Sequence, residues 1–98
     1  MRKMDKKRDK DIVAALTTVC EAAKLDNADF SWISHQVNYQ RFPDSLEVQC
    51  VYVHQDALKS AERAGELKNI TEQINLELNV KGIQLNNLKR QVRFSSEE

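Results

Sequence analysis

The chain has 98 residues, and its 15 basic and 15 acidic side chains cancel to a formal net charge of zero. Hydrophobic residues make up 41% of it, with only two glycines and one proline. This composition is typical of one folded domain and excludes a low-complexity or disordered chain. The zero net charge excludes a uniformly basic nucleic-acid coat protein but leaves room for a local basic patch.

The first ten residues form a basic arm, or the start of a helix, ahead of a single domain over residues 11–98. The arm holds six basic and two acidic residues, whereas residues 11–29 hold one basic and four acidic residues. Apolar residues then follow helical spacing, which predicts an amphipathic helix that ends before the turn-forming segment 25–29. Its buried face carries Ile12, Leu16, Val19, Cys20 and Ala23.

The apolar period next changes from 3.6 to 2, which is typical of strands. A short segment containing Pro43 and Asp44 separates two alternating runs, so the sequence predicts an antiparallel hairpin. A symmetrical hairpin gives four cross-strand pairs on one face: Tyr39–Leu46, Val37–Val48, His35–Cys50 and Ile33–Tyr52.

A second helical region and a strand complete the prediction. Asp56 is a candidate cap for this region, in which residues 57–64 form a short turn or helix and a longer helix runs from Glu66 to an end at Gly82. Val92 and Phe94 alternate with polar residues, which predicts a final strand. The fold class is therefore α+β: a two-layer sandwich in α-β-β-α-β order, with two helices packed on one face of a three-stranded sheet. The last strand follows a helix, so a right-handed crossover is expected. Its place beside the first strand gives the order 2-1-3, and a place beside the second strand is the alternative.

Sulfur and imidazole chemistry have little support in the sequence. Cys20, Cys50, His35 and His54 have none of the close pairwise spacing of structural zinc ligands. The two glycines offer no phosphate loop or nucleophile elbow. The longest apolar run, Ile12–Leu16, is far shorter than the roughly 20 residues that span a bilayer. We therefore predict a cytoplasmic protein that is not an enzyme, with free thiols, no metal, no cofactor and no membrane contact.

Two sets of residues are candidates for contact with partners. A basic set could bind phosphate, although it lacks the interleaved aromatic residues that stack bases; it contains Arg2, Lys3, Lys6, Lys7, Arg8, Lys10, Lys89, Arg90 and Arg93. Phe30 and Trp32 fall on the polar face of the first strand unless a bulge reverses the phase. The candidate protein-contact set is Phe30, Trp32, Phe42, Val51 and Val53.

A three-stranded sheet has two open edges, and an open edge can pair with a second copy of the chain. The second predicted strand, Leu46–Val53, has one charged residue and no proline. We therefore predict that this strand offers an edge for a two-fold homodimer.

Several segments also resemble a known family of small uncharacterised bacterial proteins. The resemblance covers most of the first 53 residues and then thins to Lys81–Ile83; it lies in Met1–Asp9, Ala15–Thr17, Val19–Glu21, Phe30–Tyr39 and Phe42–Leu46. Members of that family often carry the label of a Fis-type transcriptional regulator, so the resemblance implies DNA binding. It implies no catalytic residue and no ligand.

A Fis-type regulator needs a C-terminal helix-turn-helix whose second helix presents basic and polar residues to DNA. Ala61 and Gly65 have the spacing of such a turn, but the helix that follows carries more acidic than basic charge, in Glu66, Glu72, Glu77, Lys68 and Lys81. We therefore expect a non-enzymatic binding or adaptor module that acts through protein contacts. The alternative is a nucleic-acid or ribosome-associated accessory protein that uses the basic arm, the labelled regulator role included.

Overall fold

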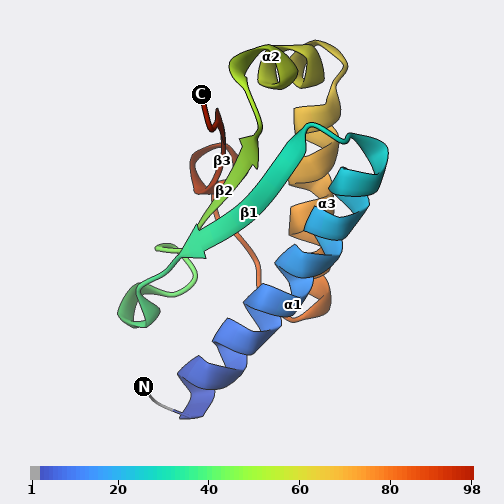
Figure 1. Cartoon of the computed structure of the whole chain (residues 1–98). Helices are drawn as coiled ribbons and strands as arrows, with labels where there is room; N and C mark the ends of the chain where they lie inside the picture. Colours follow the sequence, from blue (N-terminus) through green and yellow to red (C-terminus); the bar gives the residue numbers. More distant parts are fainter. Residues whose placement is uncertain (1–2) are drawn as a thin grey trace.

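The computed structural model describes the backbone of residues 3–98 and the side chains of residues 6–98. It is a small α+β domain with a three-stranded mixed sheet (Figure 1). The elements follow in the order helix α1 (Lys3–Asp26), strand β1 (Phe30–Gln36), 3-10 helix η1 (Tyr39–Arg41), strand β2 (Glu47–Tyr52), helices α2 (Gln55–Arg63), α3 (Glu66–Val80) and α4 (Leu88–Gln91), and strand β3 (Val92–Ser96).

Strand β2 lies at the centre of the sheet. β1 pairs with it antiparallel on one side and β3 pairs with it parallel on the other. Of the two strand orders open to the sequence, the structure has the last strand beside the second. β2 therefore has no free edge, and the prediction that it offers one to a second copy is wrong. The free edges belong to β1 and β3.

The register between β1 and β2 differs from the predicted one by two residues. Ile33 lies opposite Cys50, and His35 lies opposite Val48. The predicted pairs are wrong because β1 ends at Gln36, so the connection to β2 is longer than a tight hairpin turn and contains η1. A shift of two residues preserves the face of every side chain. For this reason the alternation predicts the inward-facing residues of β2 correctly, although it predicts the wrong partners for them on β1.

A β-bulge interrupts the start of β1, between Phe30 and Trp32. The extra residue returns Phe30 to the inner face, where it is 2% exposed and its ring meets Tyr52 edge-to-face, with centroids 5.2 Å apart. The bulge that the sequence left open as an alternative therefore reverses the phase at Phe30. Trp32 lies on the outer face, as its alternation with Ile33 indicates.

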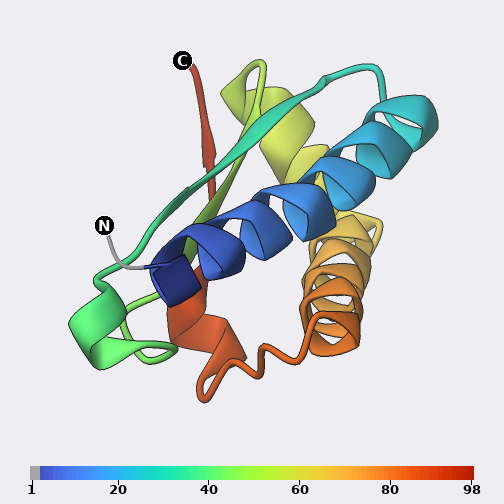
Figure 2. The same cartoon turned by 90° about the horizontal axis from the view of Figure 1, so that it is seen from below.

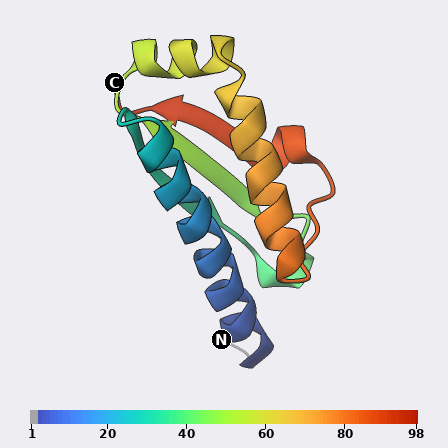
Figure 3. The same ribbon diagram turned by 90° about the vertical axis from the view of Figure 1, so that its right-hand side faces the viewer.

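Helices α1 and α3 lie side by side on one face of the sheet, and α2 crosses one end of it (Figures 2 and 3). Helical spacing explains the arrangement, because each helix turns one apolar stripe inward. The stripe of α1 is buried as predicted, with Cys20 half-exposed at its margin. The stripe of α3 contributes Ile70, Ile74 and Leu78 to the core. Gly82, at φ +77, follows the last turn of α3 as predicted.

Helix α4 and the cap of α2 were not predicted. His54, and not Asp56, caps α2: its Nδ1 accepts a hydrogen bond from the Ala57 N–H at 3.1 Å. In α4, the side chain of Gln91 is fully buried. Its Nε2 donates to the carbonyl oxygens of Pro43, at 2.8 Å, and Leu46, at 3.0 Å. Gln91 thereby ties the start of β3 to the connection between β1 and β2.

The packing of α3 yields a stability prediction. Ile74→Ala should lower the free energy of unfolding by about 2–5 kcal/mol, because Ile74 is fully buried and its truncation leaves a cavity. Leu76→Ala is the matched control on the same helix, since Leu76 is 63% exposed and should change stability by about 0.5 kcal/mol or less. Urea unfolding followed by circular dichroism measures both. Equal losses in the two variants would contradict the orientation of α3.

Candidate protein-binding groove

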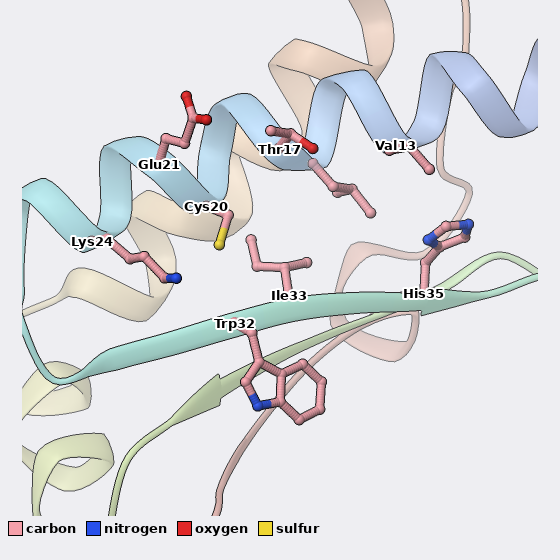
Figure 4. Close-up of a pocket in the computed structure, with 9 residues that line it drawn as sticks. Val13, Thr17, Cys20, Glu21, Lys24, Trp32, Ile33 and His35 are labelled. Carbon is pink, nitrogen blue, oxygen red and sulfur yellow. The ribbon is translucent and has the colours of Figure 1, made fainter.

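The free edge of β1 borders a groove of about 230 Å³ between this strand and α1 (Figure 4). From α1 the lining residues are Val13, Leu16, Thr17, Cys20, Glu21 and Lys24. From β1 they are Ile33 and His35, together with Trp32, whose indole points to the opposite face of the sheet. The groove therefore follows the edge strand along much of its length.

Helical spacing explains why these α1 residues line one flank. Val13, Thr17, Glu21 and Lys24 recur every three or four positions, next to the inward apolar stripe. Val13 is 45% exposed, although an exposed apolar side chain has a cost in water. Cys20 and Ile33 are half-buried in the floor. The groove has an apolar floor, with Glu21 and Lys24 toward one end and His35 at the other (Figure 4).

The outer backbone groups of β1 face this groove unprotected. Val53 N–H donates to the Asp29 carbonyl at 2.9 Å, which makes Phe30 and Tyr52 a non-hydrogen-bonded pair. Alternation beyond the bulge then turns the N–H and C=O groups of Ile33 and His35 toward the free edge. β1 contains no proline, lysine, arginine or acidic residue. It thus lacks the charged side chains and the proline with which natural proteins often protect edge strands, and its β-bulge lies at its first residues, before Ile33.

The His35 end of the groove is held in place by the start of α1. Asp9 Oδ1 accepts a hydrogen bond from the Tyr39 hydroxyl at 3.2 Å and lies 3.3 Å from His35 Nε2. Next to it, the Arg8 guanidinium lies 4.8 Å from the centroid of the Phe42 ring, which stacks on Tyr39. The first turns of α1 are therefore fixed to the connection between β1 and β2.

The predicted protein-contact residues differ in how exposed their side chains are. Phe30 and Val51 are each 2% exposed, so neither is available to a partner and both predictions are wrong. For Val51 the reason is Trp32, which lies opposite it in the register. The indole Nε1–H of Trp32 donates to Glu97 Oε1 at 3.0 Å, so the ring passes over β2 and covers Val51. Phe42 and Val53 are half-buried against the core, and Trp32 is 41% exposed.

The predicted basic set is only partly brought together. Lys6, Lys7 and Lys10 are exposed on the first turns of α1, and Lys89 is exposed on α4, which lies well away from the start of α1 (Figures 1 and 3). Arg90 Nη2 donates to the Asp44 carbonyl at 3.0 Å. Arg93 is separate, because it lies beside Gln49 on the outer face of the sheet. Arg2 and the side chain of Lys3 fall outside the described residues.

The two thiols lie in different environments. Cys50 is fully buried, and this burial, with a smaller contribution from Cys20, raises the pKa of its thiol to about 12. His35 lies opposite Val48, so the predicted neighbourhood of His35 and Cys50 is wrong. Among the side chains from residue 6 onward, no group of three His, Cys, Asp or Glu residues is placed to hold a metal ion.

Sequence reasoning did not identify the α1 flank as part of a site. Val13, Thr17 and Lys24 look like ordinary positions of an amphipathic helix, and Ile33 looks like one of the paired positions on one face of the predicted hairpin. The sequence signal for this site is the absence of charged residues and proline in β1.

Comparisons with protein-family models, with curated proteins and with solved structures find no match to this chain. No helix in residues 3–98 is long and apolar enough to cross a membrane.

Thiol chemistry tests this geometry. At neutral pH, Ellman's reagent should label Cys20 in the native protein and label Cys50 only after unfolding, since Cys50 is buried and protonated. Cys20→Ala should remove the fast phase of labelling, and Cys50→Ala should leave it unchanged.

The pKa of Cys50 also predicts how stability depends on pH. The ordinary pKa of its thiol is 9.0, and its pKa in the folded protein is higher. The contribution of Cys50 to stability is therefore complete below about pH 9 and is lost as the pH rises toward about 12. Rapid labelling of Cys50 in the folded protein would contradict this placement.

Proposed function

We propose that the protein is a non-enzymatic binding or adaptor module that accepts an extended protein strand along the free edge of β1. One observation carries the proposal: an unprotected edge strand lies directly beside a groove. In strand addition, main-chain hydrogen bonds to the edge supply affinity, and adjacent pockets select alternate side chains of the added segment. In this protein the free edge of β1 offers the main-chain groups, and the groove between α1 and β1 offers the adjacent pocket.

The lining of the groove indicates what the added segment looks like. Alternate side chains of a strand point to the same face, so every second residue of the segment would point toward α1. The floor formed by Val13, Leu16 and Ile33 favours apolar side chains at those positions. Strand β1 has seven residues, so a segment of roughly five to seven residues fits its length.

The state of the buried thiol also supports a binding role over a nucleophilic one. A nucleophilic cysteine acts as the thiolate and needs a base beside it. The raised pKa of Cys50 disfavours its thiolate, and its cross-strand neighbour on β1 is Ile33. Cys50 therefore acts as a small apolar core residue.

Selection from a random peptide library tests this function. The expected peptides carry apolar residues at alternate positions and shift the backbone amide resonances of residues 30–36. Val13→Glu should weaken their binding by about tenfold or more, because it introduces a charge into an apolar groove. Leu76→Glu makes the same change at an exposed leucine on α3 and should leave affinity unchanged. Peptides that bind elsewhere, or that tolerate Val13→Glu, would contradict the proposal.

Nucleic-acid binding is the second candidate, and the basic end of α1 favours it. Lys6, Lys7 and Lys10 are exposed there, whereas Lys89 is exposed on α4. Arg8 is already stacked on Phe42, however, and Arg93 lies on another face. Few aromatic side chains are available to stack bases. The charge arrangement therefore supports at most binding to the phosphate backbone.

Titration of labelled RNA and DNA at about 50 and 200 mM salt decides between the candidates. If the basic end binds phosphate, replacing Lys6, Lys7 and Lys10 with glutamate should abolish binding, and each lost contact should lower the salt slope by roughly 1. Lys59→Glu with Lys68→Glu, in α2 and α3, is the charge-matched control. The adaptor proposal predicts that neither nucleic acid binds the wild-type protein.

A further inference from the structure

We propose that the strand accepted at this edge is β1 of a second copy, which makes a two-fold dimer with a continuous six-stranded sheet. This inference rests on the proposed function, because it uses the same site and names its occupant. It replaces the predicted contact through β2, whose two sides are both paired. The other free edge, that of β3, belongs to a shorter strand that contacts α2 and α4.

β1 is complementary to itself. Its midpoint is Ile33, whose backbone groups face the free edge, so two copies can meet at Ile33 as a hydrogen-bonded antiparallel pair. The symmetry axis of that pairing stands perpendicular to the sheet. A two-fold contact of this kind closes on itself, so it produces a dimer and not a filament.

The same axis brings the two α1 helices together. It keeps both helices on the same face of the extended sheet and makes them run antiparallel beside one another. Each presents the flank that carries Val13, Thr17 and Cys20, which lines the groove beside β1 (Figure 4). The half of the groove that one copy leaves open is then covered by the helix of the other. This explains why Val13 is exposed in the single chain.

The charges along α1 match this antiparallel arrangement. Lys6–Asp11 contains four basic and two acidic residues, whereas Glu21–Asp29 contains one basic and three acidic residues. An antiparallel pair places the basic start of each helix opposite the acidic end of the other. The dipoles of two antiparallel helices attract each other, so they also favour this arrangement. A parallel pair would place like charges together, so the charge pattern selects the two-fold arrangement.

Analytical ultracentrifugation over a hundredfold range of micromolar concentration tests the dimer. The expected species has twice the chain mass of 11.3 kDa. Val13→Glu should give the single-chain mass at the same concentrations, and Leu76→Glu should remain dimeric. A wild-type protein that stays at one chain mass throughout would overturn the inference.

A charge exchange tests the arrangement of the helices. Replacing Lys6, Lys7 and Lys10 with glutamate makes α1 acidic along its length, and Glu21→Lys with Asp26→Lys makes it basic. Each variant alone should be monomeric through repulsion, and an equal mixture should restore the dimer. Lys68→Glu with Glu72→Lys exchanges charges on α3 and should have no effect. A mixture that stays monomeric, or variants that dimerise alone, would overturn the antiparallel pairing.

The peptide measurements keep the two proposals separate. A monomeric protein that binds a selected peptide at residues 30–36 retains the proposed function and overturns the dimer. If the protein remains dimeric with Val13→Glu and also in each charge-exchange variant alone, β1 is not the dimer surface. If no peptide binds at β1 even in dilute monomer, the proposed function fails as well.

Discussion

The parallel pairing of β3 with β2 is the interaction on which the rest of the structure depends. It gives β2 a partner on both sides and buries it in the middle of the sheet, so that β1 remains at the edge. Gln91 supports this pairing from the start of β3, because its buried amide satisfies carbonyl groups of the β1–β2 connection. A buried amide without these partners would destabilise the fold. The free edge of β1 is therefore a consequence of how the C-terminal strand is placed.

The groove beside β1 also depends on α1 being held at both ends. At its start, Asp9 and Arg8 contact the β1–β2 connection. At its end, Asn27 Nδ2 donates to Glu66 Oε2 at 3.0 Å, and the same oxygen accepts a hydrogen bond from the Tyr52 hydroxyl at 2.5 Å. Burial, and then the bond to Glu66, raise the pKa of Tyr52, which keeps its proton and its role as donor. A helix fixed at both ends presents a preorganised groove, which lowers the entropic cost of binding.

Although the net charge of the chain is zero, its basic and acidic residues are concentrated in different parts of α1. Basic residues dominate the start of α1, and acidic residues dominate its last turns and the loop that follows. A strand edge gives only sequence-independent backbone bonds, so by itself it would accept many segments. Charges at the rim of an interface favour one register and one partner over others. In the proposed dimer the backbone of β1 supplies affinity, while the charges along α1 supply orientation.

The sequence by itself determined the elements and their faces. Apolar spacing identified the inward stripe of α1, the buried positions Ile70, Ile74 and Leu78 of α3, the alternation around β2, and the end of α3 at Gly82, because these patterns arise within one element. It did not determine the hairpin register, since a shift of two residues leaves every face unchanged. The bulge that buries Phe30, the place of β3 beside β2 and the cover of Val51 by Trp32 all depend on residues far apart in the chain. The groove was hidden for the same reason: Val13 and Ile33 form one surface only after β1 becomes the edge strand beneath α1.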